Sequence, residues 1–166
     1  MKINILKIFL LLFVLSFITA CEQESVDPGA TPLVDVAGEW WVEYYYEDPP
    51  GSGTFINPGW GIYKIITSNT ASNTVDEMLI DDTEGWGVMY KVNVSGTSFS
   101  VTDAEDLAGG TDAITVSNGT VIIDGGLSTS GVVTDSISFD FVQPTADPTL
   151  YRAAGVRRTG FLEDEH

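Results

Sequence analysis

The carboxylates of the segment EMLIDD, at residues 77–82, are the side chains best placed to do chemistry in this chain. Glu77 and Asp81 fall on one face of an alternating strand. If that face points into the protein, burial would raise the pKa of Glu77, and two acids at a suitable separation could hydrolyse a glycosidic bond. The alternative is that Met78 and Ile80 point inward and the acids face water, because a register change of one residue reverses the assignment.

Other catalytic and metal-binding arrangements have little support in the sequence. The only histidine is His166, at the end of an acidic tail, whereas a Ser-His-Asp or Cys-His site needs a positioned imidazole. No serine occupies a strand-to-helix nucleophile elbow, and the short acidic runs lack the ligand spacing of an EF-hand. We therefore expect no metal and no cofactor, and we assign no catalytic residue. A hydrolase would have to use the speculative acids Glu77 and Asp81.

Aromatic residues are the second group that could carry function, and they are concentrated in the segment GEWWVEYYYED at residues 38–48. Trp40, Tyr44 and Tyr46 alternate with acidic side chains, so we expect them to be interior. An interior tyrosine offers a ligand both an apolar ring and a hydroxyl group. The alternative is a packed interior that the aromatic side chains simply fill. The predicted ligand pocket consists of Tyr44, Tyr46, Trp60, Trp86, Tyr90, Phe139 and Phe141.

Two further aromatic residues, Trp41 and Tyr45, fall on the acidic face of the same strand. Exposed there, they could stack on a sugar or contact a partner protein, together with the loop of residues 49–58, although isolated exposed aromatic residues are also common. This interpretation would make the protein a non-catalytic interaction subunit.

The elements that position these side chains are β-strands. From Val36 onward apolar and polar residues alternate with period two, and capped stretches with a helical period are absent. Asn118-Gly119, between two alternating runs, is the clearest hairpin. Because a meander of strands must protect its edges, we predict an all-β fold, an up-and-down antiparallel barrel of about eight strands, with a two-sheet β-sandwich as the alternative. The strands are expected at residues 38–47, 59–68, 75–81, 86–95, 97–103, 112–117, 119–124, 132–143 and 148–159.

The first twenty residues have the anatomy of a lipoprotein signal peptide. A positively charged start precedes an apolar run at residues 8–18, which is too short for a durable membrane span. The following residues 18–21, ITAC, resemble a bacterial lipobox, which predicts that acyl groups on Cys21 anchor the chain to a membrane. Cys21 is the only cysteine, so no disulfide forms within the monomer. The alternative is an ordinary secretory signal with an incidental cysteine.

Removal of this leader leaves 146 of the 166 residues, enough for one domain with a hydrophobic core. The leader takes Lys2 and Lys7 with it, so five basic residues face 24 acidic ones and the net charge becomes −19. A charge of this size excludes nucleic acid as a partner. The expected organisation is a signal peptide at residues 1–20, a lipidated N-terminus and flexible tether at 21–35, a β-barrel domain at 36–161 and an acidic tail at 162–166.

Gly38-Glu39-Trp40 resembles the Gly-x-Trp motif of lipocalins and other calycins. Those proteins place an arginine from the last strand across the tryptophan, a position that Arg157 or Arg158 would take here. A guanidinium group over an indole ring contributes about 0.5–2 kcal/mol. The resemblance implies that Trp40 and one of these arginines close one end of a barrel.

Four segments together resemble a narrower family, Bacteroidota lipoproteins described as lipid-binding putative hydrolases with a calycin-like barrel. The resemblance implies a bound lipid or other small apolar ligand. The acidic residues just behind Cys21 also resemble a surface-export signal. The sequence thus predicts an extracytoplasmic lipoprotein of the outer membrane, with display at the cell surface and an outer-membrane protein partner as further expectations. The four segments are WWV at residues 40–42, TASNTVDEMLIDD at 70–82, KVNV at 91–94 and GVRRTGF at 155–161.

Overall fold

Alternation of apolar and polar side chains produces nine antiparallel strands and no α-helix in the residues that the structure describes, 30–143 and 147–166 of a computed structural model. The predicted signal peptide and Cys21 lie outside these residues. A short 3-10 helix, η1 (Leu162–Asp164), follows the last strand. The strands are β1 (Gly38–Glu47), β2 (Phe55–Ile56), β3 (Ile62–Asn69), β4 (Glu77–Asp82), β5 (Val88–Ser95), β6 (Ser98–Ala104), β7 (Ile114–Leu127), β8 (Val133–Gln143) and β9 (Asp147–Arg157).

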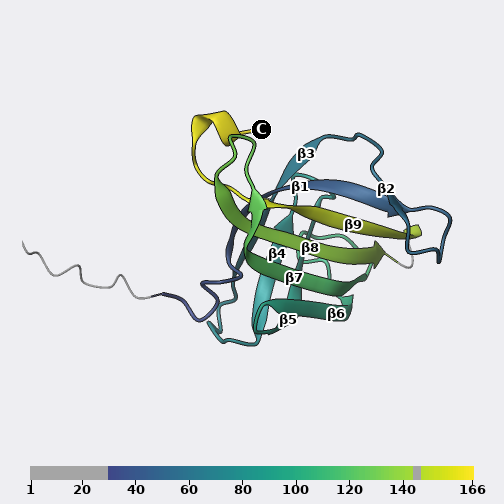
Figure 1. Cartoon of the computed structure of the whole chain (residues 1–166). Helices are drawn as coiled ribbons and strands as arrows, with labels where there is room; N and C mark the ends of the chain where they lie inside the picture. The colour runs from purple at the N-terminus through teal and green to yellow at the C-terminus, as the bar shows by residue number, and fades with distance from the viewer. Residues whose placement is uncertain (1–29, 144–146) are drawn as a thin grey trace, which may run out of the picture.

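Eight of these strands close into a barrel around a single interior (Figure 1). Consecutive strands from β3 to β9 pair with one another, and β1 pairs with both β3 and β9. The register of the closing pair places Trp40 opposite Arg157 and Tyr46 opposite Tyr151. The short β2 pairs with β1 outside this circuit. The predicted up-and-down barrel is therefore confirmed, and the two-sheet sandwich is excluded.

The barrel interior is filled by the inward set of each alternating strand. On β1 the buried side chains are Trp40, Val42 and Tyr44, and on β4 they are Met78, Ile80 and Asp82. Close packing of such side chains provides most of the stabilisation of a small barrel. Every pairing that closes the barrel lies between residues 38 and 157.

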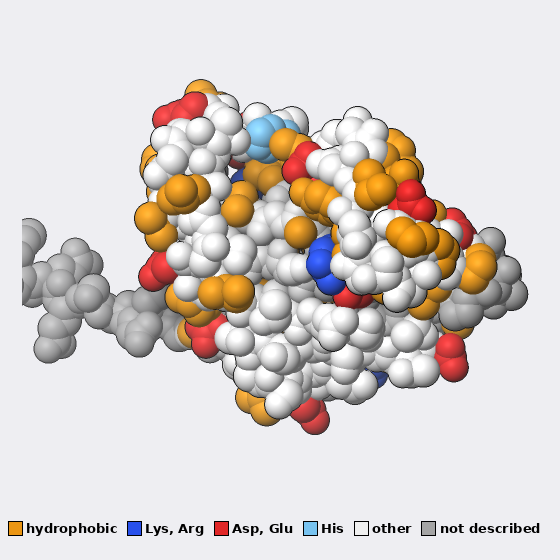
Figure 2. Space-filling view, turned by 45° about the vertical axis from the view of Figure 1, so that its right-hand side comes forward, with side chains coloured by type: hydrophobic (Ala, Val, Ile, Leu, Met, Phe, Trp, Pro, Cys, Tyr) orange, Lys and Arg blue, Asp and Glu red, His pale blue; other side chains and the backbone are white. Residues whose placement is uncertain are grey.

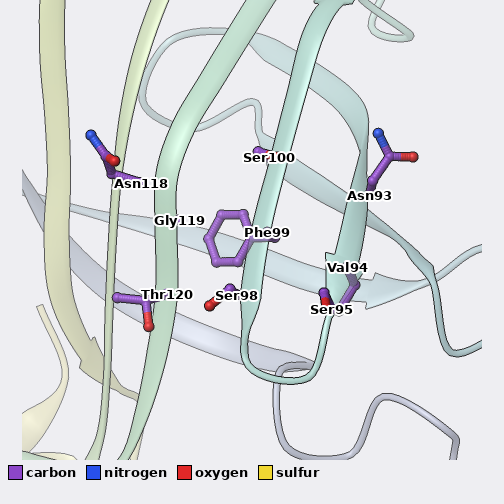
Figure 3. A pocket seen from close by; sticks show the side chains of 9 residues that line it. All are labelled: Asn93, Val94, Ser95, Ser98, Phe99, Ser100, Asn118, Gly119 and Thr120. Carbon is purple, nitrogen blue, oxygen red and sulfur yellow. The ribbon is translucent and has the colours of Figure 1, made fainter.

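The hairpin predicted at Asn118-Gly119 is wrong, because both residues lie within the single strand β7. Asn118 has a φ of 54°, and the pairing of β7 with β8 shifts between Ser117 and Thr120, which indicates a β-bulge. A Cβ atom on Gly119 would lie 2.4 Å from Cδ2 of Phe99. Figure 3 shows the Phe99 ring extending from β6 toward Gly119 on β7. The glycine is thus needed for close packing of two strands and not for a turn.

The two ends of the barrel differ in how they are covered. We call the end where β1 begins and β9 finishes the closed end, and the opposite end the open end. Under the closed end pack Leu33 and Val36, from the segment that leads into β1. Thr67 Oγ1 donates a hydrogen bond to the carbonyl oxygen of Val36 at 2.6 Å. Within the described part of the chain, no helix has the length and hydropathy needed to cross a membrane.

Candidate functional site

An aromatic cluster, which we call the aromatic mouth, occupies the open end of the barrel. Its rings come from β1, β3, β8, β9 and the loops before β3 and β5, and the nearest pair, Trp86 and Tyr151, has centroids 4.5 Å apart. Trp60 lies outermost, with 49% of its surface exposed and its ring centroid 6.3 Å from that of Trp86. The mouth consists of Tyr44, Trp60, Tyr63, Trp86, Phe141 and Tyr151.

The loop that carries Trp60 has residues typical of a tight turn. Gly59 and Gly61 flank the tryptophan with φ values of 74° and 108°, a conformation that glycine adopts without strain. The Gly59 amide donates to Asn57 Oδ1 at 2.7 Å, and the Tyr63 hydroxyl donates to the Trp60 carbonyl oxygen at 3.1 Å. Asn57 Nδ2 also donates to Glu43 Oε1 at 3.0 Å, which ties the start of the loop to β1. The loop thereby places the Trp60 ring at the mouth.

Beneath the aromatic rings lies a buried polar pair, Tyr44 and Asp82. The Tyr44 hydroxyl donates a hydrogen bond to Asp82 Oδ1, and Asp82 is only 1% exposed. Burial raises the pKa of Asp82 to about 7, although hydrogen bonds from Tyr44 and the Trp86 amide act in the opposite direction. Burial and the neighbouring carboxyl group also raise the pKa of Tyr44. A Cβ atom on Gly85 would lie 2.5 Å from Asp82 Oδ1, so this position needs glycine.

The closed end is a structural seal, with Trp40 completely buried. Its indole Nε1 donates to Thr67 Oγ1 at 2.8 Å, and the Arg157 guanidinium carbon lies 4.4 Å from the centre of the Trp40 ring. Arg157 also donates to the Ala37 carbonyl oxygen at 2.5 Å and to Asp135 Oδ2 at 2.8 Å. Arg158 instead pairs with acidic side chains on the outer surface. Of the two arginines that the sequence offered, Arg157 is the one across Trp40.

The predicted pocket residues fall into two groups. Trp60, Trp86 and the half-buried Tyr46 lie at or near the open end, where solvent reaches them. In the closed half of the barrel the inward side chains are buried, from Trp40 at 0% to Phe99 at 3% and Val94 at 8% exposure. The other predicted residues, Tyr44, Tyr90, Phe139 and Phe141, are buried in the interior.

Sequence reasoning missed Tyr63 and Tyr151, and it named Asp82 only among the acids of the segment EMLIDD. The interior position of Asp82 could have been predicted, since this residue alternates with the inward Met78 and Ile80. The two tyrosines gave no such signal, because their place in the site depends on the closure of β1 against β3 and β9.

The speculative acids Glu77 and Asp81 lie on the outer face of β4. Glu77 Oε2 pairs with Lys91 Nζ at 2.9 Å, and hydrogen bonds, chiefly from Thr70, lower the pKa of Glu77 to about 2. Asp81 accepts a hydrogen bond of 2.7 Å from the Thr83 hydroxyl. The structure therefore does not bring these two acids together with Asp82 in the interior. In the ranges 30–143 and 147–166, no group of three His, Cys, Asp or Glu side chains could hold a metal ion.

The outer wall of β1 carries a separate hollow of about 240 Å³. Trp41 lies in its lining, half-buried, with its ring centroid 5.5 Å from the His166 ring in an edge-to-face arrangement. Tyr45 donates to Glu43 Oε2 at 3.3 Å and does not belong to this lining. A second hollow, of about 510 Å³, lies along β5, β6 and β7 (Figure 3), and its lining is mainly serine, threonine and asparagine. Neither of these two hollows is lined by a member of the aromatic mouth.

An eight-stranded antiparallel barrel with a sealed end and an aromatic open end defines a calycin-like barrel. Over residues 25–162 the chain matches a family described as "lipid-binding putative hydrolase", and it belongs to that family. The family resemblance seen in the sequence is therefore confirmed, whereas the Bacteroidota origin stays a prediction. No curated protein matches this chain.

Proposed function

We propose that this protein binds a lipid or another small apolar molecule at the aromatic mouth, and that acyl groups on Cys21 hold it at a membrane. The observation that carries the binding proposal is the gradient of exposure at the open end, from the half-exposed Trp60 to the buried Phe141. Membership of a family described as lipid-binding supports the same ligand class. Pockets for such ligands are typically aromatic walls with a few polar groups.

The filled interior determines where the ligand would lie. Because the inward side chains of the closed half are buried, an acyl chain would enter at the open end, by displacing the Trp60 side chain and packing on Trp86 and Tyr151. Each square ångström of apolar surface removed from water contributes about 25 cal/mol, so covering these rings would favour binding. The loop at residues 57–61, in which Gly59 and Gly61 flank Trp60, would provide the necessary movement.

The Tyr44–Asp82 pair suits the polar end of a ligand. A neutral or cationic group fits this position better than a carboxylate. A ligand carboxylate would be repelled by Asp82, and no member of the mouth is a basic side chain that would offset this repulsion. Neutral lipids, such as alcohols and monoacylglycerols, are therefore the favoured class. Hydrolysis through Glu77 and Asp81 is not proposed, since both acids lie on the outer face.

The anchor is supported by the sequence alone. The lipobox-like residues 18–21, the single cysteine and the polar residues 22–32 behind it favour an outer-membrane lipoprotein displayed outside the cytoplasm. An outer-membrane protein partner would contact Trp41 and Tyr45 on the outer face of β1.

Fluorescence titration of residues 22–166, purified without detergent, tests the binding site. Mono-oleoylglycerol is expected to change the emission of Trp60 and Trp86 and to saturate at one molecule per chain. Trp60→Ala should weaken binding about tenfold, which corresponds to about 1.4 kcal/mol. Trp41→Phe, on the outer wall, is the matched control and should leave the affinity unchanged. Absence of saturable binding, or equal losses in both variants, would refute a site at the mouth.

A further inference from the structure

The closed end of the barrel carries an unusual share of the exposed apolar side chains. Of the thirteen large apolar residues that are exposed in the described ranges, nine lie on or beside this end. Figure 2 shows orange side chains on the lobe at the upper left, beside the pale blue histidine. Large exposed apolar areas mark sites of interaction with proteins or membranes, and a concentration of exposed apolar side chains at one end points to such a site. The nine residues are Val34, Val75, Ile122, Ile123, Leu127, Val132, Val133, Phe161 and Leu162.

The hairpin that presents these side chains is well ordered by its contacts. Its pairing continues from β7 to β8 as far as Leu127 and Val133, with a register shift after Ile122. The Ser130 amide donates to Asp164 Oδ1 at 2.7 Å, and the Thr159 hydroxyl donates to Asp164 Oδ2 at 2.7 Å. The hairpin and η1 are thereby joined into one surface, which holds its apolar side chains outward.

The position of the N-terminal segment indicates what covers this surface. The chain enters the barrel at the closed end, where Leu33 and Val36 pack. Cys21 lies nine positions before Ala30, and an extended chain of that length spans at most about 32 Å. If Cys21 is acylated, the closed end is therefore the end held near the bilayer, and the aromatic mouth lies on the far side of the barrel.

The charge of the protein decides between two possible partners of the closed end, a lipid surface and a second copy of the chain. The mature net charge of −19 opposes pairing of two identical closed ends. Four exposed acids, Asp35, Asp76, Asp124 and Glu163, also lie at this end and would be repelled by anionic headgroups. An apolar but acidic surface fits a zwitterionic interface best.

We propose that the closed end docks into the interface of a zwitterionic bilayer, so that the aromatic mouth faces away from the membrane. This inference rests on the proposed anchor at Cys21 and is independent of the ligand bound at the mouth. Its consequence is that ligand reaches the mouth from the aqueous side and not directly from the supporting bilayer.

An environment-sensitive fluorophore on the acylated protein in phosphatidylcholine vesicles tests this orientation. Ile123→Cys carries the label at the closed end, and Leu107→Cys, in the loop between β6 and β7 at the open end, is the matched control. The exposed fractions of the two positions are 50% and 49%, so neither substitution should impair folding. Acylation blocks the thiol of Cys21, which leaves one labelling site in each variant.

The Ile123→Cys label is expected to show blue-shifted emission and quenching by spin-labelled lipid, while the Leu107→Cys label shows neither. Replacing 30% of the phosphatidylcholine by phosphatidylglycerol should reduce the shift. Equal emission from both labels on protein whose mass shows acylation would overturn the docking alone. A mass without acyl groups would overturn both the anchor and this inference, while ligand binding at the mouth would be judged separately by its titration.

Discussion

The closed and open ends of the barrel use the same residue types for different purposes. At the closed end Trp40 is fully buried, its N–H is paired with Thr67 and its face is covered by Arg157. At the open end Trp60 has aromatic neighbours but keeps 49% of its surface exposed. A tryptophan whose polar and apolar parts are both satisfied stabilises the fold, whereas one left half-covered retains surface for a ligand. The contrast shows that the surroundings of a tryptophan, and not its residue type, decide whether it stabilises the fold or keeps surface for a ligand.

Replacement of each tryptophan by alanine provides the largest test of this comparison. Trp40→Ala should lower the free energy of unfolding by about 3–5 kcal/mol, because it empties a packed site and removes the partner of Arg157. Trp60→Ala should lower it by about 1 kcal/mol or less, since the side chain is half exposed. Urea denaturation of both variants measures the difference. Similar losses would mean that the open end is as structural as the closed end.

The pH dependence of stability tests the buried carboxyl of the open end. The pKa of Asp82 is about 7 in the folded protein and near 3.8 in the unfolded chain, so between these values the folded state binds more protons. Stability should therefore fall as pH rises from about 4 to about 7, and it should level off above that. A shift of this size corresponds to a loss of at most about 4 kcal/mol.

Urea denaturation at pH 5 and pH 8 measures this loss, with Asp82→Asn as the comparison. The variant should lose most of the difference between the two pH values, because it cannot ionise. Glu77 does not interfere, since its lowered pKa makes its contribution change between about pH 4.5 and about pH 2. Retention of the full difference in Asp82→Asn would show that another group causes it.

Local patterns in the sequence were sufficient for the barrel but not for the whole mouth. The alternation at residues 38–47 predicted β1 with the bounds that it has, because acidic residues mark its wet face. The segment EMLIDD is compatible with either face inward, and only the pairing of β4 with β3 and β5 places Asp82 in the interior. Asn118-Gly119 has the local chemistry of a turn, yet packing of Phe99 against Gly119 keeps it within a strand. Contacts between residues distant in sequence decide these cases.

The smallest expected effect concerns the outer face of the barrel wall. Glu77→Gln and Asp81→Asn should leave the affinity for mono-oleoylglycerol unchanged, because both side chains point away from the interior and interact with Lys91 and Thr83. Glu77→Gln breaks an exposed ion pair, and such pairs contribute little to stability. Titration of both variants beside Trp60→Ala measures this contrast. A loss in either acid variant comparable to that of Trp60→Ala would mean that the ligand contacts the outer wall, and the site would then have to be moved from the mouth to β4.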